Sequence, residues 1–253
     1  MLILLSPAKT LDFESAAITN MVSEPDFADE SEILIKKLST FSAGALAELM
    51  DISPALAELN FERYQTLHRH RADVRSKQAI LTYIGEAFRG LNAASMNDDD
   101  FEFAQSHLRI LSGMYGILRP LDLIQPHRLE MAAKLKIEKF TNLYQFWGDK
   151  ITAKLNEDLS ENDFVVNLAS DEYFKSVNLN KLKAKVITPI FKDFNKGSYR
   201  VVIMYAKNAR GAMTNYIIKN KISNPEDMKS FDLNGYRFMP ELSEGGNWVF
   251  ARG

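Results

Sequence analysis

The chain has 253 residues, of which 46% are hydrophobic and 25% charged, and its formal net charge is −2. This composition is that of an ordinary globular protein rather than a disordered or fibrous one. It contains no cysteine, which excludes disulfides, thiolate nucleophiles and thiolate metal sites. The apolar start at residues 1–5 is too short for a signal peptide or a membrane span, so we expect a cytoplasmic protein with no membrane partner.

The small net charge hides an uneven distribution of charges. Between Leu11 and Glu62 eleven acidic side chains face only two basic ones, whereas between Asp171 and Lys221 eleven basic side chains face only three acidic ones. A locally positive surface is therefore compatible with a nearly neutral protein, and such a surface attracts polyanions. The alternative is that the two regions neutralise each other in the fold or scatter over the surface.

The first half of the chain predicts one strand followed by helices. Residues 2–5 predict a buried strand that ends at Ser6-Pro7, and apolar spacing predicts a helix around residues 33–38. Residues 43–65 predict two short helices joined by a tight turn, with Ser53 capping the second helix. The acidic run at 98–100 indicates the N-terminal cap of a further helix rather than a metal site.

The second half predicts strands and helices in irregular alternation. An apolar stripe predicts one helix over residues 141–159. The remaining predicted elements are strands at 164–168, 185–191 and 199–204, a hairpin turn at 195–198, a helix at 209–221, and a final strand pair at 236–239 and 247–251. This order favours a mixed α/β fold, with a central mixed β-sheet surrounded by helices, in a single domain spanning residues 1–253.

The histidines show no metal-ligand spacing. None of the four, His68, His70, His107 and His127, lies in a His-Glu-x-x-His or Glu-x-x-His pattern. The first two lie among arginines, which disfavour a bound cation, so we interpret that segment as a solvated basic helix. The nucleophile-elbow and dinucleotide-binding patterns are also missing. We therefore expect neither a metal site nor a cofactor.

Four polar clusters follow turns or strand ends. They are residues 6–10 with Lys9; residues 109–131 with Arg109, Tyr115, Arg119 and Arg128; residues 167–175 with Ser170, Tyr173 and Lys175; and residues 205–211 with Lys207 and Arg210. Strand ends are where α/β sheets bind ligands, and the start of a helix attracts phosphate. Each cluster alone is explained by solvated or ion-paired side chains. Together they predict that cations distant in the sequence converge on one anion-binding cleft.

Several long and unusual stretches resemble the YaaA family of bacterial peroxide-stress resistance proteins. The most specific are Leu111-Ser-Gly-Met-Tyr-Gly-Ile-Leu-Arg-Pro-Leu-Asp122, Asn167-Leu-Ala-Ser-Asp-Glu-Tyr-Phe-Lys175 and Tyr205-Ala-Lys-Asn-Ala-Arg-Gly211. The resemblance covers essentially the whole chain. It implies a cytosolic protein that keeps unincorporated iron low under peroxide stress and so limits oxidative damage to DNA. It also implies a family-specific single-domain α/β fold with a positively charged cleft.

The same resemblance implies binding to double-stranded or bubble DNA and a helix-hairpin-helix element, for which residues 43–65 are the best match. We therefore favour DNA as the partner and expect no obligate protein partner. In this hypothesis the two tyrosines, Tyr115 and Tyr173, stack on unpaired bases. The phosphates contact the basic side chains of Lys9, Arg109, Arg119, Arg128, Lys175, Lys207 and Arg210.

Two other functions remain open. The protein is alternatively an enzyme that acts on a nucleotide or a damaged nucleobase in the same cleft. Glu130 or Glu172 then serves as acid or base near Ser170 and Tyr173. Direct sequestration of iron is the third hypothesis, and the missing cysteines and ligand-spaced histidines make it the least favoured.

Overall fold

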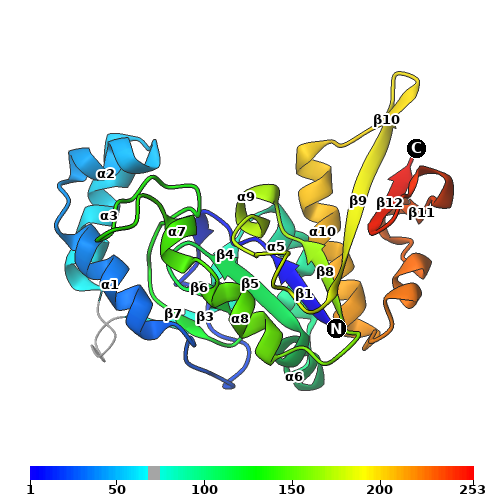
Figure 1. The fold of residues 1–253 in the computed structure, drawn as a ribbon, viewed down its shortest axis with the longest axis horizontal. Helices are drawn as coiled ribbons and strands as arrows, with labels where there is room; N and C mark the ends of the chain where they lie inside the picture. The colour runs from blue at the N-terminus through cyan, green and yellow to red at the C-terminus, as the bar shows by residue number, and fades with distance from the viewer. Residues whose placement is uncertain (68–74) are drawn as a thin grey trace.

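A computed structural model describes residues 1–67 and 75–253 (Figure 1). The basic segment around His68 and His70 falls outside the described residues. The central sheet has the strand order β11-β12-β9-β8-β1-β5-β6, with β10 pairing β9 beside this path. Apolar residues on both faces of β1 leave that strand fully buried in the middle of the sheet.

The central sheet is parallel at its centre and antiparallel at its edges. The parallel strands are β12 (Asn247–Arg252), β9 (Lys185–Asn195), β8 (Phe164–Leu168), β1 (Leu2–Leu5) and β5 (Leu108–Ser112). The antiparallel edge strands are β11 (Arg237–Phe238), β10 (Ser198–Arg200) and β6 (Gly116–Leu118). Two separate two-stranded sheets pair β2 (Thr10–Leu11) with β4 (Tyr83–Ile84), and β3 (Lys77–Gln78) with β7 (Leu123–Ile124). The predicted mixed α/β sheet is confirmed.

Helices surround the sheet. In chain order they are α1 (Ala28–Ser39), α2 (Ala43–Met50), α3 (Pro54–Thr66), α4 (Ala79–Thr82), α5 (Glu86–Leu91), α6 (Asp98–His107), α7 (Leu143–Trp147), α8 (Lys150–Glu157), α9 (Asp171–Phe174) and α10 (Ile203–Lys219). Short 3-10 turns lie at Ala93–Ser95, Pro225–Ser230, Leu233–Gly235 and Pro240–Leu242. Helices α1 to α3 form a lobe at the left of Figure 1, away from the β9–β12 edge at the right.

Two predicted element boundaries are wrong. The single helix expected over residues 141–159 is broken at Gly148, whose positive φ of 48° ends α7 before α8 begins. Helix α10 begins at Ile203 rather than near residue 209, so the strand predicted at 199–204 ends at Arg200. The paired helices α2 and α3, the cap of α6 and the hairpin between β9 and β10 are confirmed.

Helices α5 and α10 cross at very short distance, and two glycines permit this. A Cβ atom on Gly211 would lie 1.7 Å from the carbonyl oxygen of Ala87, and one on Gly90 would lie 2.1 Å from that of Asn208. No side chain fits at either position unless the helices move apart. The crossing therefore fixes α10 against the segment that begins at Gly85.

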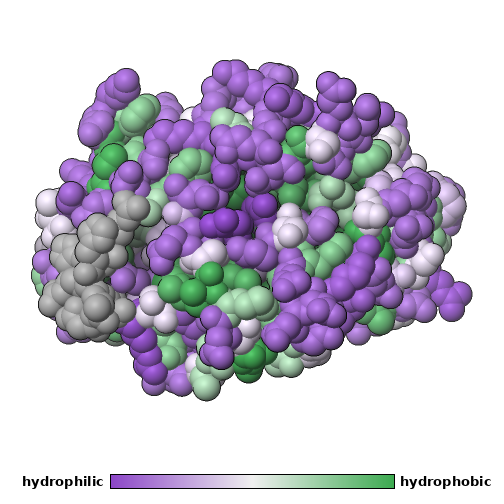
Figure 2. Space-filling view, turned by 90° about the horizontal axis from the view of Figure 1, so that it is seen from below, coloured by the Kyte–Doolittle hydropathy of each residue, from purple (hydrophilic) through white to green (hydrophobic). Residues whose placement is uncertain are grey.

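The surface seen from below in Figure 2 is mostly hydrophilic, with hydrophobic residues in small separate areas. Most large apolar side chains lie inside, around the buried ring of Trp147 and the strands of the central sheet. This distribution is the expected one for a chain with a hydrophobic core and a hydrated surface.

Candidate functional site

A cavity of about 680 Å³ opens where β1 and β8 end, and we call it the cleft. The two strands are neighbours and run parallel, so their carboxyl ends meet at the same edge of the sheet. Its walls are residues 5–10 at the end of β1, residues 84–88 at the start of α5, residues 168 and 170–173 at the end of β8, Glu130, and three side chains of α10. The predicted convergence of segments 6–10, 167–175 and 205–211 is therefore found in the fold.

The floor of the cleft is fixed by a pair of serines. The backbone N–H of Ser170 donates to Oγ of Ser6 at 2.8 Å, and the Ser6 hydroxyl donates to Oγ of Ser170 at 3.2 Å. Ser170 precedes α9, but its side chain makes no capping hydrogen bond, and α9 is a single turn of four residues. The two hydroxyl groups therefore join strand ends, and the phosphate-binding helix start expected at Ser170 is too short to act as one.

Arg210 is the most unusual side chain of the cleft. It lines the cavity and is only partly exposed, yet its guanidinium forms no hydrogen bond or ion pair with any described residue. Burial lowers the pKa of Arg210, and the charge of Asp171 acts against that shift. A guanidinium has five N–H donors, and withdrawing them from water without a partner is costly. The guanidinium of Arg210 therefore faces the cleft with its hydrogen-bond donors unused by the described residues.

Lys207 lies one helical turn before Arg210 and also lines the cleft. It is exposed, and among the described residues it has no carboxylate partner. The two side chains are three positions apart on α10, so they share a face, as the sequence predicted. Together they give this wall of the cleft two positive charges without a direct ion pair among the described residues, although the charge of Asp171, which also lines the cleft, acts on Arg210.

Glu130 neutralises the opposite wall. Its Oε2 lies 2.8 Å from Nζ of Lys9, and its Oε1 lies 2.8 Å from Nη2 of Arg128. Lys9 is 64% exposed at the mouth of the cleft, whereas Arg128 is largely buried behind it. Two of the predicted phosphate-binding cations are therefore close to the cleft but share one carboxylate. Their net contribution is a single positive charge.

Acidic and phenolic groups complete the cleft. Glu172 accepts a hydrogen bond from the backbone N–H of Ala132 at 3.2 Å through Oε1. Tyr173 is buried, and burial raises the pKa of its phenol, so its hydroxyl is protonated at neutral pH. Both residues line the cleft together with Glu130 and Ser170. The four residues predicted as acid, base or partner in catalysis are thus brought together.

Four other predicted residues do not line the cleft. Arg109 is buried and lies 2.9 Å from Asp158. It lies near the amino end of β5, whereas the cleft lies at the carboxyl ends of the parallel strands. Arg119 follows β6, and because β6 runs antiparallel to β5, Arg119 also lies near the amino end of β5. It pairs with Asp122 at 3.1 Å. Tyr115 is buried, and its hydroxyl accepts a hydrogen bond from the backbone N–H of Gln125, so it cannot stack on a base. Lys175 is exposed just after α9, outside the lining of the cleft.

The hairpin between β9 and β10 carries cations that the sequence-based selection missed. Lys192, Lys196 and Arg200 have no ion pair with any described residue, and Arg200 only donates to Oγ of Ser198. The hairpin projects beyond the sheet on the side where α9 and the start of α10 lie (Figure 1). The signal was present in the sequence, as basic residues spaced on both sides of the turn at Lys196-Gly197.

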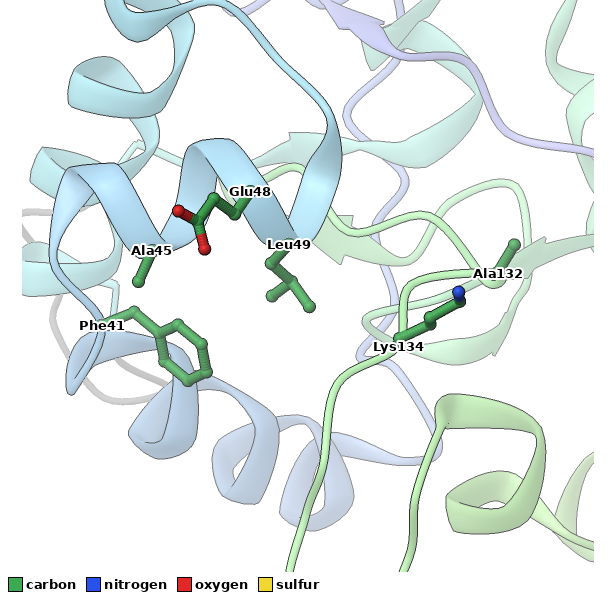
Figure 3. A pocket seen from close by; sticks show the side chains of 6 residues that line it. All are labelled: Phe41, Ala45, Glu48, Leu49, Ala132 and Lys134. Carbon is green, nitrogen blue, oxygen red and sulfur yellow. The ribbon is translucent and has the colours of Figure 1, made fainter.

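The α2–α3 hairpin lies away from the cleft. A separate hollow of about 510 Å³ lies between its first helix and the loop at residues 132–134 (Figure 3). Glu48 and Leu49 line one side and Lys134 the other, while Glu130, just before this loop, lines the cleft. Acidic residues surround the turn of the hairpin, namely Glu48, Asp51, Glu58 and Glu62. Phosphate contacts there would have to use backbone N–H groups.

In residues 1–67 and 75–253, no three His, Asp or Glu side chains are grouped so as to hold a metal ion. No helix in these ranges combines the length and the apolar character needed to cross a membrane.

Comparison with known proteins gives the family. The sequence model of the family described as "Peroxide stress protein YaaA" matches residues 1–242. The chain is also similar to a "UPF0246 protein" from Colwellia psychrerythraea, with 47% identity over 254 residues that cover 100% of this chain and 99% of the relative. The match extends through every segment of the cleft. The chain therefore belongs to the YaaA family of peroxide stress proteins.

Proposed function

We propose that this peroxide stress protein binds DNA in the cytoplasm and takes one unpaired nucleotide into the cleft. The observation that carries the proposal is the partly buried guanidinium of Arg210, which has no partner among the described residues. Charge-assisted hydrogen bonds from arginine to phosphate are among the strongest polar contacts that proteins make. A phosphate at Arg210, with Lys207 beside it, completes that site.

The size of the cleft favours a nucleotide over a duplex. Pockets for small molecules measure about 300–1,000 Å³, and the cleft, at about 680 Å³, falls within this range. A double helix is too wide to enter, but an unpaired nucleotide swung out of a bubble fits. We therefore expect bubble DNA to bind more tightly than fully paired DNA of the same length.

Cations outside the cleft lining, three of them exposed, supply contacts for the flanking backbone. Lys175, Lys192, Lys196 and Arg200 have no carboxylate partner among the described residues, in contrast with the paired Arg109 and Arg119. Exposed aromatic and apolar side chains lie among them, including Phe194, Ile203 and Tyr205. Cations interspersed with exposed rings are the usual platform for single strands.

The link between DNA binding and iron is also part of the proposal. The protein would limit oxidative damage by lowering free iron and by occupying DNA that iron and peroxide attack. We propose no iron site within the cleft, because among the described residues no three His, Asp or Glu side chains are grouped so as to hold a metal ion.

A second candidate function is an enzyme that acts on a nucleotide or a damaged nucleobase in the same cleft. The observation that favours it is the gathering of Glu130, Glu172 and Tyr173 in one cavity with Arg210. Glu172 uses one carboxylate oxygen on a backbone N–H, which orients the group. Such a positioned carboxylate acts as a general base. In this function Glu172→Gln abolishes turnover and retains ligand binding.

The DNA proposal is tested by fluorescence anisotropy with a labelled duplex that contains a central bubble. Replacing Arg210 by Gln should weaken binding by about tenfold or more, the loss of a charge-assisted contact of about 1.5 kcal/mol or more. The matched control is Arg237→Gln, because Arg237 is an exposed arginine on β11, outside the cleft lining. Equal affinity of wild type and Arg210→Gln would refute the proposal.

A further inference from the structure

Among the described residues, buried side-chain polar atoms without partners are rare, and two of them belong to residues that line one cavity. Among the described residues, the buried side-chain atoms that lack a hydrogen-bond partner are Oε2 of Glu32, Oη of Tyr83 and Nε of Arg128. Tyr83 and Arg128 line the same small chamber of about 20 Å³. Buried polar groups in native proteins are nearly always satisfied, so a shared chamber between two exceptions indicates a missing partner.

This inner chamber adjoins the cleft. Lys9, Glu130 and Tyr173 line both cavities, and Pro7 and Ala8 do so as well. A cavity needs about 10–15 Å³ to hold one water-sized group. The inner chamber therefore accommodates one oxygen atom, placed at the wall of a cavity large enough for a nucleotide.

The walls of the inner chamber present two unused donors beside the Glu130 carboxylate, whose oxygens are engaged by Lys9 and Arg128. Arg128 uses Nη2 on Glu130, which leaves its Nε–H unused. Tyr83 is 4% exposed, and burial raises the pKa of its phenol. A contact from the Ser112 hydroxyl to the phenol oxygen, outside full hydrogen-bond geometry, lowers that pKa by less, so the phenol remains protonated and its own O–H is not used in this contact. Ser112 already accepts the backbone N–H of Tyr115 through its hydroxyl oxygen. A guanidinium N–H and a phenol O–H both seek an acceptor, so the occupant must offer a lone pair.

We propose that the inner chamber is a subsite for one acceptor oxygen, which hydrogen-bonds to Oη of Tyr83 and Nε of Arg128. In the protein without ligand this oxygen belongs to a water molecule. In the complex a carbonyl oxygen of the nucleobase held in the cleft replaces that water. This replacement of the water by a base carbonyl rests on the proposed function. It makes the cleft selective for bases that carry a carbonyl group, such as thymine or an oxidised purine, over adenine and over abasic sites.

The first experiment tests the inner chamber without any ligand. A crystal structure of the wild-type protein at a resolution that shows ordered water should contain one oxygen within about 2.7–3.2 Å of both atoms. The same site should be altered or empty in Tyr83→Phe. A dry chamber, or an occupant bonded to neither atom, overturns the proposal even if DNA binds elsewhere as proposed.

The second experiment tests selectivity with two bubble duplexes, one with unpaired thymines and one with abasic residues at the same positions. Tyr83→Phe should weaken binding of the thymine bubble by about five- to tenfold, the value of one neutral hydrogen bond, and leave the abasic bubble unchanged. Arg128→Lys keeps the charge beside Glu130 but removes the Nε donor, and it should show the same selective loss. Tyr115→Phe, which removes a buried hydroxyl outside the chamber, should change the two affinities equally or not at all.

The possible failures are distinguishable. Equal effects of Tyr83→Phe on both duplexes overturn the carbonyl subsite and leave the Arg210 anion site intact. If the wild-type protein binds neither duplex, the proposed function fails together with the carbonyl selectivity. The crystallographic water then still decides whether the inner chamber is an oxygen site.

Discussion

The hydroxyl oxygen of Ser6 lies 2.8 Å from the backbone nitrogen of Ser170, although 164 positions separate the two residues in the chain. The contact joins the segments that leave β1 and β8 at the carboxyl edge of the sheet. It therefore holds together two walls of the cleft, at the point where a ligand would touch both.

Replacing Ser6 by Ala should lower the free energy of unfolding by about 1 kcal/mol, because the partly buried N–H of Ser170 loses its acceptor. Urea denaturation followed by circular dichroism measures the change. Ser170→Ala is the matched control, since it keeps the N–H donor and its acceptor, and it should cost less. An equal or larger loss in Ser170→Ala would show that the hydroxyl–hydroxyl contact matters more than the backbone bond.

Replacing Gly211 by Ala should destabilise the protein by roughly 2 kcal/mol or more, because the added methyl group would overlap the carbonyl oxygen of Ala87. The helices α5 and α10 would separate, and the wall that carries Arg210 would move with them. Gly44→Ala is the control and should change the stability in the opposite direction, since Gly44 is exposed in α2 and a Cβ there meets nothing closer than 3.9 Å. That substitution should stabilise by about 0.5–1 kcal/mol. Equal effects of the two would contradict the close crossing.

His127 should make the protein less stable in mild acid. Burial lowers its pKa from 6.5 to about 4, so the folded state resists a proton that the unfolded state accepts. The stability is fully present above pH 6.5 and falls as the pH drops toward 4, by about 3 kcal/mol in total. Urea unfolding as a function of pH measures this loss.

The matched variants are His127→Gln and His107→Gln. The first should remove most of the pH dependence between 6.5 and 4. The second should remove less, because His107, whose pKa burial also lowers, is only partly buried. A pH profile that is unchanged in His127→Gln would show that His127 is not the group responsible.

Much of the sheet could be predicted from the sequence, because buried strands such as Leu2–Leu5 are short apolar runs between turn residues. The helix predicted over residues 141–159 failed for an identifiable reason. Phe146, Trp147 and Ile151 are buried on both sides of the break, so the apolar periodicity continues through Gly148 although the backbone does not.

The site was predictable where local geometry decides it. Lys207 and Arg210 share a helical face, so their proximity followed from their spacing. The meeting of Ser6 and Ser170 depends on the pairing of β1 with β8, which spacing along the chain does not show. Arg109 was misplaced because its partner, Asp158, is 49 positions away and becomes its neighbour only in the folded chain. A single sequence shows which residues are basic, but not which of them are already paired.

DNA affinity should depend steeply on salt. If about six phosphates contact the cleft and the β9–β10 hairpin, the slope of log K against log salt concentration should be roughly −5. Replacing Lys196 or Arg200 by Gln should each reduce that slope by about one. Lys36→Gln, on α1 and paired with Glu32, is the control and should leave it unchanged. A slope near zero, or an equal change in the control, would argue against phosphate contacts on the hairpin.

The most direct test of the account is a crystal structure of the complex with a short DNA that contains an unpaired bubble. We expect a phosphate oxygen within hydrogen-bond reach of the Arg210 guanidinium, Lys207 beside it, and one unpaired nucleotide inside the cleft. DNA bound only at the α2–α3 hairpin, with nothing at Arg210, would contradict the central claim.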